Sequence, residues 1–98
     1  MVEHLVLFKI APEATAEQRA AMIVGLKELR VLIPGIVDLS VGTNFSARNQ
    51  GFEIGLVVRF TDRAALEAYL PHPAHRGCVD RVIAPIRVDG IVVDYEIG

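Results

Sequence analysis

The sequence predicts an α+β domain of the ferredoxin-like type, built on a four-stranded antiparallel sheet. Three observations support this prediction. The 98 residues suit a single domain that covers residues 1–98. Four stretches have the alternating pattern of strands, and helical stretches separate them in the order β-α-β-β-α-β. Right-handed crossovers then place the first and third strands at the centre of the sheet.

The first strand and the first helix have clear boundaries. Residues 2–10 carry apolar side chains on both faces, which is typical of a buried strand. Thr15 begins a helix, because Gln18 follows it at the spacing of a capping box. Pro34 and Gly35 end this helix. Its apolar stripe consists of Met22, Ile23, Leu26, Leu29, Leu32 and Ile33.

The next two strands predict a hairpin. Residues 36–45 alternate apolar and polar side chains, as a strand at a sheet edge does. Residues 46–51 are polar and rich in turn formers, which favours a loop. Residues 52–60 form the third strand, with Glu53 and Arg59 on the face opposite its large apolar side chains. These two charges either pair across a subunit interface or lie on a solvent-exposed rim.

Prolines divide the second helical region into two segments. Thr61 and Asp62 predict an N-cap for a short helix that ends by residue 70. Pro71 and Pro73 prevent that helix from continuing smoothly. Because proline is favoured at the first helical position, Pro73 begins a second segment, which ends at Pro85.

The last strand and the uncovered sheet face predict the assembly. Residues 86–97 form the last strand, with a turn or bulge at residues 89–90. Two helices cover one face of the sheet, and the other face carries Leu5, Leu7 and Val57. A homodimer that closes a shared dimeric α/β barrel would bury this apolar surface. We therefore expect a second copy of the chain as its partner.

Composition argues against several classes of function. Hydrophobic residues make up 52% of the chain, the formal net charge is −2, and no cluster of Lys and Arg occurs. We therefore expect no nucleic-acid partner and no membrane partner. No apolar stretch approaches the roughly 20 residues that span a bilayer, and the N-terminus does not have the pattern of a signal peptide. Cys78 is the single cysteine, so no internal disulfide is expected, which fits a cytoplasmic location.

Titratable side chains are concentrated in residues 69–75, Tyr-Leu-Pro-His-Pro-Ala-His. This segment holds two of the three histidines and one of the two tyrosines. A neutral imidazole such as His75 accepts a proton at neutral pH, and a phenol such as Tyr69 hydrogen-bonds a developing oxyanion. In the alternative interpretation, His75 hydrogen-bonds the backbone at the helix break and has a structural role.

The other two histidines extend this expected site. His4 lies on an apolar strand, where a buried imidazole needs a polar partner that Tyr69 or His75 can supply. A core histidine satisfied in some other way remains an alternative. His72 precedes His75 by three residues, so it is either a ligand-binding side chain on the same helix face or a helix cap. A zinc site needs further ligands, and none is suitably placed, so we expect no metal and no cofactor.

The chain resembles the stress-responsive A/B barrel (Dabb) family. The resemblance lies in residues 3–9 (Glu-His-Leu-Val-Leu-Phe-Lys), in residues 69–75 and in residues 93–96 (Val-Asp-Tyr-Glu), and it extends over nearly the whole chain. It implies one Dabb-type domain that forms a dimeric αβ-barrel. The family includes proteins of undefined role, plant stress proteins and a polyketide cyclase, olivetolic acid cyclase.

The similarity to the cyclase implies roles for individual residues. His75 would be the catalytic general base, and Tyr69 would help to hold the substrate. Met22 and Leu26 stand where the cyclase has bulky aromatic side chains, so the substrate is expected to differ. The expected ligand is a small aromatic or β-keto compound. The expected ligand-binding residues are His4, His72, Met22 and Leu26.

Three functions remain open at this point. The first is a small homodimer of undefined role with a small-molecule pocket between sheet and helices. The second is a cofactor-free polyketide cyclase or lyase that uses His75 as its general base. The third is a protein like the antibiotic-biosynthesis monooxygenases, which share the architecture. We rank it last because their typical site residues are absent.

Overall fold

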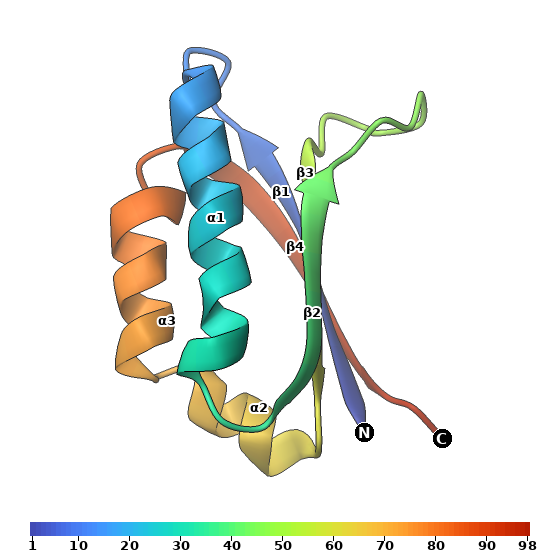
Figure 1. Ribbon diagram of the computed structural model, residues 1–98. Coiled ribbons are helices and arrows are strands. Elements are labelled where there is room, and N and C mark those ends of the chain that lie inside the picture. The colour runs from blue at the N-terminus through green and yellow to red at the C-terminus, as the bar shows by residue number, and fades with distance from the viewer.

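The computed structural model describes residues 1–98 and has the predicted ferredoxin-like fold (Figure 1). The strand order is β2-β3-β1-β4, and every neighbouring pair is antiparallel, so β1 and β3 are central as predicted. The elements are β1 (Val2–Ile10), α1 (Ala16–Leu32), β2 (Ile36–Thr43), β3 (Ile54–Phe60), α2 (Arg63–Tyr69), α3 (Pro73–Cys78), the π-helical turn η1 (Val79–Ile83) and β4 (Arg87–Glu96).

The predicted capping box begins α1. The Thr15 hydroxyl accepts a hydrogen bond from the Gln18 backbone at 3.0 Å, and the Gln18 side chain accepts one from the Thr15 backbone at 2.9 Å. These two bonds satisfy backbone N–H groups that the first helical turn leaves without partners. Local sequence therefore fixes where α1 starts.

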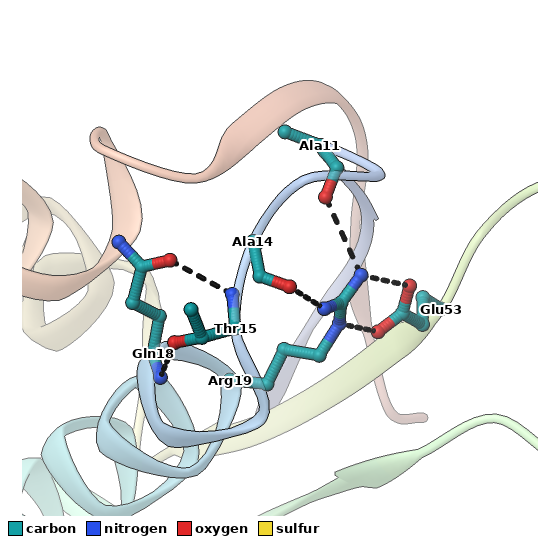
Figure 2. A network of polar contacts seen from close by, with 6 residues as sticks. All are labelled: Ala11, Ala14, Thr15, Gln18, Arg19 and Glu53. Atoms are coloured by element: carbon teal, nitrogen blue, oxygen red, sulfur yellow. Dashed lines mark hydrogen bonds and ion pairs between the residues drawn. The ribbon is translucent and has the colours of Figure 1, made fainter.

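Arg19 ties this first turn of α1 to the start of β3, as Figure 2 shows. Its guanidinium donates to the carbonyl groups of Ala11 and Ala14 and forms a two-bond ion pair with Glu53. The expected pair across an interface is therefore wrong for Glu53. Glu53 lies just before the first residue of β3, and its carboxylate, which is 33% exposed, pairs with α1 of its own subunit.

The hairpin strands are shorter than predicted. β2 ends at Thr43 and β3 begins at Ile54, whereas the sequence predicted strand structure to residue 45 and from residue 52. The difference arises because Asn44 uses its side-chain amide to hold the Phe52 carbonyl at 2.8 Å. Side-chain bonds of this kind compete with strand pairing and favour turns.

The helices all lie against one face of the sheet (Figure 1), and the core lies between the two layers. None of these helices combines the length and the apolar character that crossing a bilayer requires. The largest fully buried side chains are Tyr69, Phe60, Met22, Leu26, Leu29, Ile54, Leu56, Val58 and Cys78.

The outer face of the sheet, which no helix covers, is apolar and partly exposed. Ile91, Val93 and Tyr95 of β4 are about half exposed. Arg59 also lies on this face and pairs with Glu3 of the neighbouring strand, with 2.5 Å between Nε and Oε1. Arg59 thus has its ion-pair partner within its own subunit, which corrects the expected pair across an interface. The remaining apolar side chains on this face are Leu5, Leu7 and Val57.

The irregularity predicted near residues 89–90 is a β-bulge in β4. Lys9 of β1 pairs with Asp89, but the next residue of β1, Ile10, pairs with Arg87. Val88 is therefore the extra residue of β4. An extra residue reverses the side-chain alternation beyond it. Arg87 consequently lies on the helix-covered face of the sheet, like its partner Ile10.

Candidate functional site

A cavity of about 180 Å³ lies between the sheet and the helices. Strands β1, β3 and β4 form one wall, and α1, α2, α3 and η1 form the other. Most of the lining is apolar. The lining residues on which the chemistry depends are His4, Leu26, Tyr69, Leu70, His75 and Arg87.

A second hollow, of about 340 Å³, lies beside the cavity, between α2 and the end of β4. It is larger, but no histidine lines it. The Leu70 side chain lines both hollows, and Asp94 lines the second one. We take the smaller cavity as the candidate site because the titratable side chains singled out from the sequence converge there.

His75 lies in the first part of α3, directly after the proline-containing break. Its Nδ1 is 2.9 Å from the carbonyl oxygen of Leu70. A carbonyl only accepts hydrogen bonds, so Nδ1 carries the proton and Nε2 keeps a free lone pair in the neutral ring. Burial lowers the pKa of His75 below its ordinary value of 6.5, although the bond to Leu70 acts in the opposite direction. His75 is therefore neutral and basic at pH 7.

Tyr69 is the last residue of α2 and is 1% exposed. Its ring lies 4.3 Å from the His75 ring and 5.0 Å from the Phe60 ring, measured between centroids. Its hydroxyl makes no hydrogen bond within the chain and is not sealed in the core, so it faces the cavity. Burial raises the pKa of the phenol well above its ordinary value. The hydroxyl therefore stays protonated and can donate to a ligand.

His4 is 5% exposed, and its partner is a residue that sequence reasoning left unassigned. Its Nδ1 lies 2.5 Å from an oxygen of Asp94, the residue opposite it on β4. The expectation that Tyr69 or His75 would be its hydrogen-bond partner is wrong, although the His4 ring packs 5.9 Å from the Tyr69 ring. The carboxylate accepts from Nδ1, so Nε2 of His4 also keeps its lone pair in the neutral ring.

The two remaining expected ligand-binding side chains lie outside the cavity lining. Met22 is fully buried in the core, while Leu26, one turn further along α1, reaches the cavity. His72 is the N-cap of α3, and its Nδ1 accepts a hydrogen bond from the Ala74 backbone at 3.0 Å. The structure thus supports the capping alternative for His72. Its ring is engaged at the helix end and does not share a helix face with His75.

Sequence reasoning missed Arg87 as a cavity group and Asp94 as the partner of His4. The pairing of Asp94 with His4 depends on the register of β4, and the position of Arg87 depends on the bulge. Side chains of β4 alternate between the two faces of the sheet, and the predicted bulge reverses this alternation once. With Asp94 on the inner face, following the alternation back along the strand would have placed Arg87 on the inner face as well. Nowhere do three or more His, Cys, Asp or Glu side chains come together as a metal site.

Cys78 lies close to this site but has different properties. It is 1% exposed, and burial is the main cause that raises the pKa of its thiol. A buried thiol with a raised pKa is a poor nucleophile. Cys78 is therefore a core side chain.

Comparison with known proteins agrees with this description. The family model described as Stress responsive A/B Barrel Domain matches residues 2–97. An uncharacterized protein of Streptomyces coelicolor is 32% identical over 98% of this chain and 99% of its own length. A stress-response A/B barrel domain-containing protein of Arabidopsis thaliana is 35% identical over 68 residues, which make up 68% of this chain and 26% of that protein.

Solved structures share the fold. A dimeric ferredoxin-like protein of unknown function from Jannaschia is 29% identical, with 98% of each chain covered and a TM-score of 0.80. Hydroxynitrile lyase from Passiflora edulis is 19% identical, with 99% of this chain and 93% of that chain covered and a TM-score of 0.88. The family match over nearly the whole chain, together with this fold, shows that the protein belongs to the stress-responsive A/B barrel (Dabb) family.

Proposed function

We propose that this chain binds a small molecule in the cavity between sheet and helices and catalyses cofactor-free proton transfer on it, as a lyase or cyclase does. One observation carries the proposal. His4 and His75 both have Nδ1 held by an acceptor, and the unpartnered Tyr69 hydroxyl faces the same apolar space. The cavity therefore offers basic nitrogen atoms and one neutral donor to a bound ligand.

His75 is the general base in this proposal. Its Nε2 removes a proton from a carbon or hydroxyl group of the substrate, and the Tyr69 hydroxyl hydrogen-bonds the oxygen on which negative charge develops. In a cyclase the resulting enolate attacks a second carbonyl of the same molecule, and in a lyase the electron pair expels a leaving group. The proton on His75 is then returned to the product or lost to solvent.

His4 and Asp94 have a supporting role in this proposal. A carboxylate on Nδ1 fixes the imidazole orientation and stabilises a positive charge on that ring. His4 can therefore present Nε2 to a ligand in a fixed orientation beside Tyr69. The lyase of similar fold from Passiflora edulis supports the reaction class at the level of fold alone.

The assembly we propose is a homodimer through the outer face of the sheet. Burial of apolar side chains favours association of two subunits, and Ile91, Val93 and Tyr95 are about half exposed in one subunit. The 29%-identical Jannaschia protein is dimeric. Placing a charge at the centre of this face should separate the subunits. We expect the wild type to have the mass of a dimer by light scattering and Val93→Lys to have that of a folded monomer. A monomeric wild type would contradict this assembly.

A structural role for the same residues is the second candidate. It is favoured by the His75–Leu70 hydrogen bond, which closes the break between α2 and α3. In that case the protein is a non-catalytic, stability-related dimer. Loss of the His75 side chain would then remove this hydrogen bond and cost about 0.5–1.5 kcal/mol.

Thermal denaturation distinguishes the two candidates. Wild type and His75→Ala are heated with small aromatic acids, β-keto acids and polyketide-like phenols. A compound at about 100 times its Kd stabilises the native state by roughly 2.7 kcal/mol, which raises the Tm of such a domain by about 10 °C or more. His72→Asn is the matched control, because it keeps a cap and lies outside the cavity lining.

The proposal expects a shift for at least one compound in wild type and in His72→Asn, and a smaller shift in His75→Ala. Turnover of that compound should be lost in His75→Ala. If no compound shifts the midpoint, and His75→Ala alone is strongly destabilised, the structural role is correct.

A further inference from the structure

Arg87 brings a positive charge to the cavity that the proposed reaction does not use. The bulge at Val88 turns this side chain to the inner face of the sheet. Arg87 is the one permanently charged residue in the cavity lining, and it forms no ion pair within the chain. Arg87 is exposed to solvent at the rim of this mostly apolar cavity, and a guanidinium without an ion-pair partner is an anion-binding group.

Gly90 makes room for this guanidinium. A Cβ atom at position 90 would lie 3.1 Å from both Nε and Nη2 of Arg87, and 3.3 Å from the Leu7 carbonyl oxygen. A side chain at position 90 would therefore displace the flexible end of Arg87 by a few tenths of an ångström. Both residues line the cavity wall.

The aspartates of β4 do not neutralise Arg87. Asp94 lies at the far end of the strand and is bonded to His4, and Asp89 accepts a hydrogen bond from the Gly90 backbone at 2.8 Å. Neither carboxylate lies within 4.0 Å of the Arg87 nitrogen atoms, the limit for an ion pair. The paired donors of the guanidinium fork remain available to a ligand.

We infer that the ligand of this cavity is a small carboxylic acid with an apolar body about the size of one ring, and that Arg87 binds its carboxylate. The inference rests on the proposed function of the cavity and specifies its ligand class. An apolar cavity of about 150 Å³ holds benzene, and this one measures about 180 Å³. A carboxylate matches the planar fork of arginine with two parallel hydrogen bonds.

The arrangement also places the reacting end of the ligand. Arg87 lies at the end of β4 that is far from Asp94, while His4 and Tyr69 lie further along the sheet. A ligand anchored at Arg87 would direct its opposite end toward the imidazole and phenol groups. Arg87 is thus a specificity-determining residue in this inference.

The test compares benzoate with benzamide, which has nearly the same shape but no charge. Kd values are measured by NMR titration of the ¹⁵N-labelled protein at low salt, for wild type, Arg87→Gln and Gly90→Ala. Arg48→Gln is the control, because it removes the same charge from an exposed site in the distant hairpin loop. Thermal melts establish that each variant is folded.

We expect wild type and Arg48→Gln to bind benzoate about tenfold or more tightly than benzamide, since one charge-assisted pair supplies that difference. Arg87→Gln should bind the two compounds equally, with benzamide affinity unchanged. Gly90→Ala should reduce the preference while it keeps the charge. The shifted amide signals should belong to residues of the cavity lining.

Two results would overturn the inference. Equal binding of benzoate and benzamide by wild type, within the cavity, would show that Arg87 recognises no carboxylate and would leave the cavity proposal intact. Binding of neither compound, nor of any member of the acid and phenol panel, would overturn the cavity proposal together with this inference.

Discussion

Two polar clusters, one around Arg19 in the first turn of α1 and one around Tyr69 at the end of α2, differ in how completely their groups are paired. Around Arg19 every interaction closes within the chain: the guanidinium bonds two backbone carbonyls and Glu53 (Figure 2). Around Tyr69 the pairing is incomplete. Nδ1 of His4 and Nδ1 of His75 have partners, but the phenol hydroxyl and both Nε2 atoms make no hydrogen bond within the chain.

This difference distinguishes the groups that hold the fold from the groups that are available for chemistry. A closed network stabilises the native state and offers nothing to a ligand. An open network beside a cavity contributes less to stability, because its free groups have no partner to lose. Substitutions in the two clusters should therefore change different properties of the protein.

Removing the Tyr69 hydroxyl should have the largest effect on function and almost none on stability. In Tyr69→Phe the ring contacts with Phe60 and His75 remain, and no hydrogen bond within the chain is lost. Loss of an oxyanion donor lowers turnover by about 10²–10³-fold. We expect that loss in a turnover assay with the compound identified by thermal shift, and a Tm within about 2 °C of wild type. A large fall in Tm would show that the hydroxyl belongs to a closed network.

Removing the Arg19 guanidinium should lower the stability of the fold and leave ligand binding unchanged. Arg19→Met keeps the aliphatic part of the side chain but leaves the Ala11 and Ala14 carbonyls and the Glu53 carboxylate without this partner. We expect the Tm to fall by several degrees and the Kd of any cavity ligand to stay the same. Calorimetry and the NMR titration measure the two quantities. An altered Kd with an unchanged Tm would contradict the comparison.

The stability contributed by His72 should depend on whether its replacement can still cap α3. Because His72 caps α3 through Nδ1, His72→Ala should cost about 0.5–2 kcal/mol, and His72→Asn should restore most of that stability. The free energy of unfolding is measured by urea titration. If both variants are equally destabilised, the ring of His72 contributes by packing rather than by capping.

The smallest expected effect is a pH dependence of stability due to His75. Its pKa in the folded chain is lowered, chiefly by burial, from an ordinary value of 6.5. As the pH falls below 6.5, the unfolded chain therefore binds more protons at this site than the folded chain does. The free energy of unfolding should decrease as the pH falls from 6.5 toward the lowered pKa. Above pH 6.5, His75 should make no pH-dependent contribution to it.

His75→Asn tests that slope. Urea denaturation of wild type and variant at a series of pH values should give curves that differ below pH 6.5 and run parallel above it. Identical slopes in the two proteins would mean that the folded chain does not perturb the titration of His75.

The candidate site was predictable from sequence where its groups are close together in the chain. Tyr69 and His75 lie on either side of a break that Pro71 and Pro73 impose, so local sequence brings them together. The capping box at Thr15 and the order of strands and helices follow from equally local patterns. Propensities, caps and apolar periodicity depend on neighbouring residues, so these features follow from the amino-acid sequence alone.

Tertiary structure decided how the distant groups combine. His4 meets Asp94 across 90 residues because the β1–β4 register places them opposite each other, and Arg87 turns inward because one bulge shifts that register. The position of Glu53 against Arg19 likewise depends on the packing of α1 on the sheet. A strand pattern shows which residues alternate but does not fix which residue of a remote strand lies opposite. The folded chain fixes that register through the packing of its core.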